Sequence, residues 1–393
     1  MPLLDESRLD DAAALEAGDA RGALRALASA GAQVRRSLVA AQEAGIERVG
    51  GGVRPRSVLV ASLGGSEAVA DTLDLLAEPG SPVPVTSRRS GPLPGWVGPL
   101  DLVIAVSQSG RAPGPLALAA EAARRGASLL TVGAADSPLA EVSARARGVH
   151  VETAVATPST RTALFSLLVP VLRAADVLGL ASCPVAELEE VANVLDAVAT
   201  ECRPSSDTFV NPAKSLALDL APTIPVVLGA SPMSGVASRR AAAVLARTAR
   251  IPATHGTLPH DASSVLACFD GPYAASAGSA AGADLFADPF LDGPVTPRLG
   301  LLLLRGTSPE TFAGGTPSVT FDPATEALAD AVAEAARESG VRVWEHHAAP
   351  GGPVVGLASL IALTDFAATY LALGLGIDPT VSAHVADLRD RTR

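Results

Sequence analysis

Short apolar runs alternate with longer segments in which apolar residues recur at helical spacing, and this alternation covers most of the chain. The apolar runs predict strands at 57–62, 83–86, 101–107, 127–132, 148–152, 224–229, 252–257, 299–304 and 341–346. The periodic segments predict helices within 8–50, 160–221 and 236–249, and at 66–77, 113–125, 260–268, 325–338, 354–374 and 382–391. Strands separated by about a dozen helical residues are typical of parallel βαβ units, because a hairpin needs only a short turn.

The same order of parts occurs twice along the chain: a strand, a Gly/Ser turn, a helix, a short strand and a strong strand. We therefore expect an α/β protein with two doubly wound domains, each with a central parallel sheet flanked by helices. The predicted parts are an N-terminal helical segment 1–50, a first domain 51–180, a helical linker 181–215 and a second domain 216–393. The Ala/Gly/Ser-rich segment 274–283 is expected to be a loop or hairpin insertion on the surface.

Composition narrows the class of protein. Hydrophobic residues make up 48% of the chain, which is enough for a large core, and the net charge of −11 argues against a nucleic-acid partner. The three cysteines are widely spaced and form no Cys-x-x-Cys pair, which is typical of a cytoplasmic protein without disulfides or a metal site. The N-terminal residues lack the basic start and apolar run of a signal peptide.

The longest apolar region, 353–377, has the length of a membrane span. Asp365 lies near its middle, and a carboxylate there costs about 2.5–3.5 kcal/mol even on lenient membrane-insertion scales. We therefore expect a buried core helix and no membrane partner.

The candidate chemistry lies where two predicted strands end in turns rich in glycine and serine. Strand 57–62 leads into Leu63-Gly64-Gly65-Ser66, and strand 101–107 leads into Ser107-Gln-Ser109-Gly110. Main-chain N–H groups and serine hydroxyls at the carboxyl edge of a parallel sheet suit a phosphate dianion without a lysine. The residues expected to bind a phosphorylated metabolite are Gly64, Gly65, Ser66, Ser107, Ser109 and Gly110.

Two further observations define this site. The first turn lacks the Gly-x-Gly-x-x-Gly spacing of a dinucleotide site, so no nucleotide cofactor is expected. The strong strand of the second half ends in Arg305-Gly-Thr and not in Ser-x-Ser-Gly. We therefore expect one anion site per chain.

Together with Pro158-Ser-Thr-Arg161-Thr-Ala at the start of a helix, the two turns resemble the sugar isomerase (SIS) domain. More narrowly, the chain resembles the bifunctional phosphoglucose/phosphomannose isomerase family of bacteria and archaea, which joins two such domains. The likeness spans about residues 55–392. Its further matches are Arg89-x-x-x-Leu93-Pro94, Asn211-Pro-Ala-Lys214, Leu360-Ile-Ala-Leu-Thr-Asp365-Phe and Gly376-Ile-Asp378-Pro-Thr.

The resemblance implies a homodimeric aldose–ketose isomerase that needs no metal or other cofactor and whose site is completed by the neighbouring subunit. Its implied substrates are glucose 6-phosphate, mannose 6-phosphate and fructose 6-phosphate. It also implies that the serine loop binds the phosphate and that Arg161 stabilises the enediolate.

The chain departs from that family in the groups that move protons. The family's third phosphate hydroxyl falls on Ala112, its base glutamate on or next to Arg247, and its ring-opening histidine on Ser263. Arginine does not deprotonate in a protein, so it cannot abstract a proton next to a carbonyl. His260, followed by Asp261 at the start of the same helix, is the expected substitute acid/base.

Three hypotheses follow from this mixture of matches and departures. The first is an active isomerase in which Arg161 and His260 are catalytic. The second is a catalytically inactive phosphosugar-binding sensor or regulator. The third is an isomerase or lyase for a different phosphosugar, such as an amino sugar.

Overall fold

The computed structural model describes residues 4–77, 79–153, 157–274, 298–307 and 319–391, so positions 275–283 of the expected surface insertion lie outside the described residues. The chain divides into two compact units, which we call the first unit (residues 28–196) and the second unit (residues 1–27 and 197–393). The expected N-terminal segment 1–50 and the expected linker 181–215 are each divided between these units.

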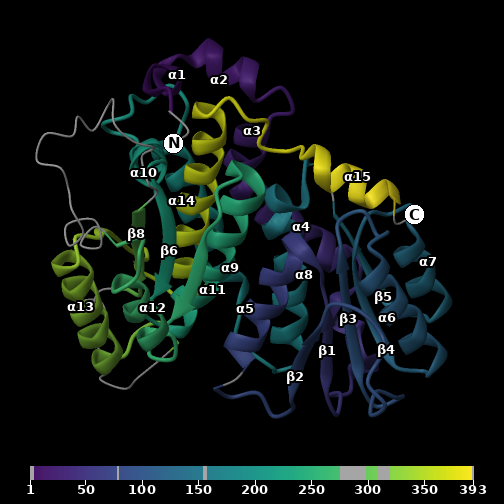
Figure 1. Cartoon of the computed structure of the whole chain (residues 1–393). Helices are drawn as coiled ribbons and strands as arrows, with labels where there is room; N and C mark the ends of the chain where they lie inside the picture. The colour runs from purple at the N-terminus through teal and green to yellow at the C-terminus, as the bar shows by residue number, and fades with distance from the viewer. Residues whose placement is uncertain (1–3, 78, 154–156, 275–297, 308–318, 392–393) are drawn as a thin grey trace, which may run out of the picture. The chain divides into compact units, whose positions relative to one another are not determined.

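The first unit is built on a parallel sheet of five strands in the order β2-β1-β3-β4-β5 (Figure 1). Its strands are β1 (Val58–Ala61), β2 (Val85–Arg88), β3 (Leu102–Ser107), β4 (Ser128–Gly133) and β5 (Val149–Glu152). The winding reverses between β1 and β3, because β2 lies on one side of β1 while the later strands follow on the other.

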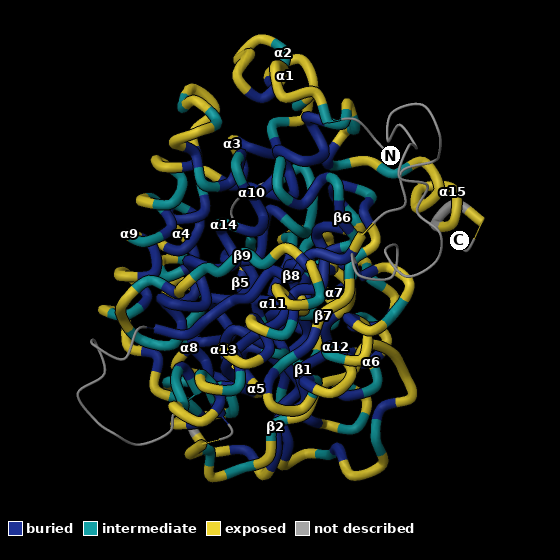
Figure 2. The backbone as a smooth tube through the Cα atoms, turned by 60° about the vertical axis from the view of Figure 1, so that its left-hand side comes forward, coloured by how far each residue is buried: buried dark blue, intermediate teal, exposed yellow. Residues whose placement is uncertain are grey.

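Helices cover both faces of this first sheet. The helices α4 (Ala30–Glu43), α5 (Glu67–Ala77) and α8 (Leu164–Val177) lie on one face, and α6 (Pro113–Arg124) and α7 (Pro138–Arg145) lie on the other (Figure 1). Every residue of β1 and β3 is therefore buried, which explains why both strands are apolar up to the terminal Ser107 of β3. Figure 2 shows the buried residues of the chain in dark blue.

The second unit repeats this winding with one strand fewer. Its parallel sheet has the order β7-β6-β8-β9. The strands are β6 (Thr223–Gly229), β7 (Thr254–Thr257), β8 (Arg298–Arg305) and β9 (Arg342–His347). The helices α10 (Pro212–Leu220), α11 (Pro232–Val244) and α14 (Pro353–Gly374) cover one face, and α12 (Ala262–Phe269) and α13 (Pro323–Glu338) cover the other (Figure 1). The prediction of two doubly wound α/β domains is confirmed.

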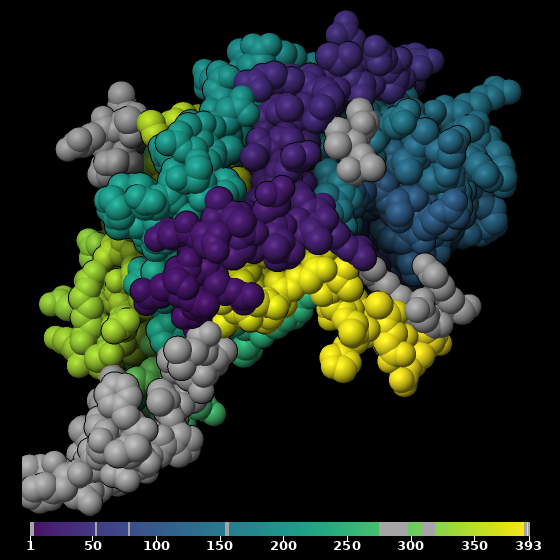
Figure 3. Space-filling view, turned by 90° about the horizontal axis from the view of Figure 1, so that it is seen from above, coloured from purple at the N-terminus to yellow at the C-terminus, as the bar shows by residue number. Residues whose placement is uncertain are grey.

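The remaining helices lie outside these layers. The N-terminal helices are α1 (Glu6–Asp10), α2 (Ala12–Gly18) and α3 (Ala23–Ala28); α9 (Val185–Glu201) crosses the boundary between the units, and α15 (Ala383–Arg391) follows α14. The Asp5 amide donates to the Gly374 carbonyl at 3.2 Å, so the N-terminal residues lie against the end of α14 (purple on yellow in Figure 3).

The helix α14 is the apolar segment that has the length of a membrane span. It is the one helix in the described part of the chain with that length and hydropathy, and 94% of its apolar window is buried inside the protein. Asp365 is buried within it and accepts from the Arg240 guanidinium of α11 at 2.6 and 3.2 Å. The expected core helix is confirmed, and the ion pair explains how its central carboxylate is accommodated.

Asp101 fixes the starts of the two central strands of the first unit. Its buried carboxylate accepts from the Ser57 hydroxyl at 2.7 Å, from the Gly98 amide at 2.8 Å and from two nitrogens of Arg56 at 2.7 and 3.1 Å. Burial acts to raise the pKa of Asp101, but the hydrogen bonds from Arg56, Ser57 and Gly98 outweigh it and hold that pKa below its usual value.

We expect Asp101→Asn to lower the free energy of unfolding by about 1.5–3 kcal/mol, because hydrogen bonds to a charged acceptor are lost. Because the pKa is lowered in the folded state, this contribution is present above the ordinary aspartate pKa and is lost as the pH falls through the lowered value. Urea unfolding at neutral and acidic pH measures both effects. Glu141→Gln, in the exposed pair with Arg145, is the control and should cost less than about 1 kcal/mol.

Candidate functional site

The two glycine-rich turns of the first unit follow neighbouring strands at the same edge of the sheet. Strands β1 and β3 are parallel neighbours, with Ala61 opposite Ala105, so the segments that follow them leave the sheet side by side. This is the point at which the winding reverses, and in doubly wound sheets ligands bind in the crevice at that point. Pairing of the strands thus brings together residues some forty positions apart in the sequence.

The first turn is the short 3₁₀ helix η2 (Gly64–Ser66), which leads directly into α5. Gly64 has a φ of +63°, a conformation that favours glycine. The Ser66 hydroxyl is buried, accepts from the Leu63 amide at 3.3 Å and donates to the Leu63 carbonyl at 3.0 Å. Ser66 therefore closes its own turn, and its expected role as a phosphate ligand stays a prediction.

The second turn presents two serine hydroxyls as possible donors. The Ser107 hydroxyl accepts from the Ala112 amide, and the Ser109 hydroxyl accepts from the Arg111 amide, both at 3.3 Å. Because each oxygen acts as an acceptor in these contacts, its proton is left for another partner. Ser107 is buried at the base of the turn and Ser109 is exposed at its surface, and their expected role as phosphate ligands stays a prediction.

Gly110 fixes the shape of this second turn. Its φ is +62°, and a Cβ there would lie 2.1 Å from the Ser137 hydroxyl oxygen. The Gly110 amide donates to the Ser107 carbonyl at 2.8 Å. Glycine is thus required for both the backbone conformation and the close approach of Ser137.

The start of α6 provides fewer donors than a helix N-terminus usually does. Ala112 is the N-cap and supplies no side-chain hydrogen bond, and Pro113 and Pro115 have no N–H group. Gly114 is left as the amide of this first turn, and no acceptor for it lies among the described residues. Sequence reasoning noted Ala112 but missed the two prolines, although both are visible in the sequence.

Arg161 lies beside the first turn, as expected from the sequence. It belongs to the short 3₁₀ helix η3 (Thr160–Ala163), and a Cβ on Gly65 would lie 3.3 Å from the Arg161 amide nitrogen and 3.1 Å from Thr160 Cβ. The Thr162 carbonyl accepts from the buried Gln33 side chain at 2.9 Å, which fixes η3 on the first unit. The structure therefore brings Arg161 and the Gly64–Ser66 turn to the same place.

His260 lies in the second unit, between β7 and α12, and is exposed. The neighbouring Asp261 carboxylate accepts from the Thr257 amide at 2.7 Å, so it stabilises the turn in which it lies. No hydrogen bond orients the His260 ring within the described part of the chain. The two expected catalytic residues, Arg161 and His260, thus lie on different units.

The helix that carries Arg247 does come near a carboxylate, which the sequence alone did not reveal. Arg247 lies in the π-helical turn η4 (Leu245–Ala249) at the end of α11. Asp365 of α14 packs against α11, but the buried Arg240 guanidinium holds it in an ion pair of 2.6 Å. Both carboxylate oxygens of Asp365 accept from Arg240, so this carboxylate is engaged in a structural ion pair.

The corresponding crevice of the second unit is filled by the chain itself. The Met233 amide at the start of α11 donates to the Val319 carbonyl at 2.9 Å, and the Ser234 amide donates to the Ser231 hydroxyl at 3.2 Å. A Cβ on Gly306, after β8, would lie 1.8 Å from the Thr320 carbonyl oxygen. These contacts leave little room for an anion there and support the expectation of one site per chain.

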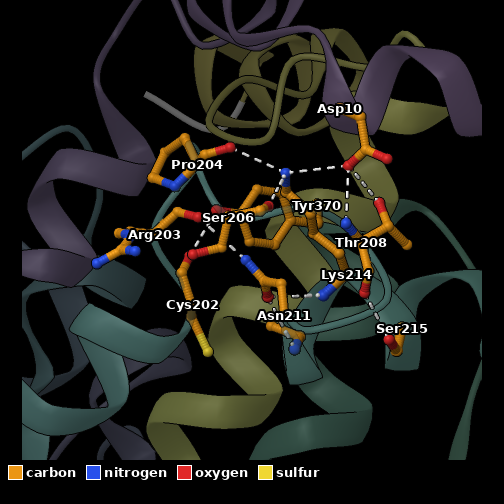
Figure 4. A network of polar contacts seen from close by, with 11 residues as sticks. Asp10, Cys202, Arg203, Pro204, Ser206, Thr208, Asn211, Lys214, Ser215 and Tyr370 are labelled. Atoms are coloured by element: carbon orange, nitrogen blue, oxygen red, sulfur yellow. Dashed lines mark hydrogen bonds and ion pairs between the residues drawn. The ribbon is translucent and has the colours of Figure 1, made fainter.

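Lys214, the single lysine of the chain, has a buried ammonium group whose protons are donated to other parts of the chain (Figure 4). Its side chain is fully buried, and its ammonium donates to the carbonyls of Ser206 at 2.7 Å and Pro204 at 2.9 Å, with Asp10 at 3.5 Å. Burial lowers its pKa, and the charge of Asp10 opposes that shift. Lys214 therefore secures the segment before α10.

No group of three or more His, Cys, Asp or Glu side chains in the described ranges could hold a metal ion.

Comparisons with known proteins place these observations in context. Residues 209–392 match the family described as the bacterial phospho-glucose isomerase C-terminal SIS domain. No curated protein matches the sequence.

Several solved structures resemble the whole chain. A proposed phosphosugar isomerase from Silicibacter pomeroyi is 23% identical with a TM-score of 0.62, covering 91% of this chain and 99% of that one. A glucose-6-phosphate isomerase from Chlamydia trachomatis is 15% identical with a TM-score of 0.61, covering 91% and 72%. Tagatose-6-phosphate ketose/aldose isomerase from Escherichia coli is 12% identical with a TM-score of 0.60, covering 95% and 97%. At these identities the likeness shows a shared fold.

We expect Gly110→Ala to disrupt the second turn. A left-handed alanine costs about 1–2 kcal/mol, and the clash with Ser137 adds about 1–3 kcal/mol. Thermal unfolding measures the loss of stability. Gly80→Ala, in an open turn of the same unit, is the matched control and should leave the melting temperature within about 2 °C. Equal melting temperatures for the two variants would contradict the constraint assigned to Gly110.

Proposed function

We propose that this chain binds hexose 6-phosphates and interconverts an aldose 6-phosphate with fructose 6-phosphate. The match of residues 209–392 to the bacterial phospho-glucose isomerase C-terminal SIS domain supports this proposal. The observation that carries the proposal is that the Gly64–Ser66 and Ser107–Gly110 turns follow paired parallel strands, with Arg161 beside the first of them.

The phosphate is held in this proposal by the second turn and the start of α6. The hydroxyls of Ser107 and Ser109 donate to phosphate oxygens, and the Gly114 amide adds a main-chain donor. Hydrogen bonds to an ionised oxygen are roughly twice as strong as neutral ones, so a few such donors suffice for a dianion. Arg161, next to the first turn, then lies where positive charge can stabilise an enediolate.

Proton transfer between C1 and C2 requires a base within hydrogen-bond reach of the sugar. Arg247 cannot serve, and Asp365 is held by Arg240. We assign this role to His260, whose exposed imidazole has one nitrogen that can accept a proton and one that can donate it. A neighbouring subunit is proposed to complete the site, as the family resemblance implies.

A second candidate function is a phosphosugar-binding protein without turnover. It is favoured by two observations. Ala112 stands where the family has its third phosphate hydroxyl, and the start of α6 lacks the N–H groups of Pro113 and Pro115. In addition, Asp365, which packs against α11, is held in an ion pair by Arg240. Such a protein would report the level of a sugar phosphate through binding alone.

Binding is tested by calorimetric titration of the full chain with fructose 6-phosphate and glucose 6-phosphate. We expect Ser107→Ala and Ser109→Ala each to weaken binding roughly ten- to hundred-fold, because a hydrogen bond to a charged group contributes about 1.5–3 kcal/mol. Ser81→Ala, in the same unit before β2, is the control and should not change the affinity. Absence of binding in the wild type would contradict both candidate functions.

Turnover separates the two functions. The isomerase predicts conversion of fructose 6-phosphate to glucose or mannose 6-phosphate, with the turnover number reduced about 100-fold or more in Arg161→Met and His260→Ala while binding persists. Serine-dependent binding without conversion of any of these sugars identifies the binding protein instead.

A further inference from the structure

The first turn already holds an anion supplied by the chain. Glu67, the first residue of α5, accepts from the Gly64 amide through one carboxylate oxygen at 2.9 Å. Its other oxygen pairs with the Arg89 guanidinium at 2.8 Å. A carboxylate and a phosphate bind the same kinds of donor, so the Gly64 amide and Arg89 form a set complementary to an anion.

Arg89 is placed to reach both turns. It follows β2, the neighbour of β1, and its carbonyl oxygen lies so close to the first turn of α6 that a Cβ on Gly114 would be 1.9 Å away. The main chain of Arg89 is thus fixed beside one donor of the proposed phosphate site, while its side chain extends to the Gly64–Ser66 turn. Arg89 therefore lies next to the start of α6 with its main chain and next to the start of α5 with its side chain.

The Glu67–Arg89 ion pair is exposed enough for Arg89 to change its partner. The Arg89 side chain is 61% exposed and that of Glu67 is 29% exposed, and ion pairs with this much solvent contact contribute little to stability. A planar guanidinium can instead bind two phosphate oxygens at once, and a dianion attracts it more strongly than a carboxylate does. A dianion next to Glu67 is also repelled by it, so the carboxylate must leave when phosphate binds.

We propose that Arg89 is a phosphate-binding residue that exchanges Glu67 for the ligand, and that Glu67 sets the affinity by competing for Arg89 and for the Gly64 amide. This inference rests on the proposed phosphosugar site and adds to it a cationic ligand and a built-in competitor. The alternative is that Glu67 merely caps the start of α5 and Arg89 merely neutralises it.

A double-mutant cycle distinguishes these two accounts. Fructose 6-phosphate is titrated at fixed ionic strength into the wild type, Glu67→Gln, Arg89→Gln and the double variant. We expect Glu67→Gln to bind about three- to tenfold tighter, because the competitor loses its charge. We expect Arg89→Gln to weaken binding about tenfold in the wild type and by at least as much in the Glu67→Gln background.

The controls separate this proposal from the one on which it rests. Arg124→Gln, on α6 in an exposed pair with Glu121, should leave the affinity unchanged, and thermal unfolding confirms that each variant is folded. Serine-dependent binding in the wild type with no effect of Arg89→Gln in the Glu67→Gln background overturns the role of Arg89 alone. Unchanged affinity in Glu67→Gln overturns the competition, and absence of any binding in the wild type overturns the site as a whole.

Discussion

Parallel pairing of β1 with β3 is the constraint on which the proposed site depends. The register that sets Ala61 opposite Ala105 fixes where each strand ends, and so where each glycine-rich turn begins. The sheet order reverses between these two strands, so no intervening strand separates the turns. Arg161 reaches the same edge because η3 packs closely against Gly65, where an added Cβ would lie only 3.1 Å from Thr160 Cβ.

The fold and the location of the candidate site could be predicted from the sequence, because both depend on local patterns. Apolar runs give the strands, helical periodicity gives the helices, and the turns that follow β1 and β3 are continuous in the chain. The tertiary contacts of the two crevices were not predictable, since they join distant residues. These contacts are Glu67 with Arg89 in the first unit, and Arg240 with Asp365 and Met233 with Val319 in the second. The roles assigned to the individual site residues stay predictions.

The two units use similar architecture with different chemistry at their crevices. In the first unit the second turn keeps two serine hydroxyls, those of Ser107 and Ser109, whose protons are left for a further acceptor. The cation at this edge, Arg89, is in a largely exposed ion pair. In the second unit the main chain at 319–320 occupies the crevice, and Arg305 at the end of β8 is bound to three carboxylates, those of Glu326, Asp330 and Glu345. A buried cation with three partners is a structural element, so duplication of the fold has not duplicated the anion site.

The enclosed ammonium of Lys214 has a practical consequence for work on this protein. Because the chain has a single lysine and its side chain is fully buried, amine-reactive dyes and cross-linkers have no accessible lysine on the folded surface. Acylation at this position requires the segment around Pro204 and Ser206 to open and release its hold on the amine. The rate of such labelling would therefore report local opening of that segment at one defined point in the fold.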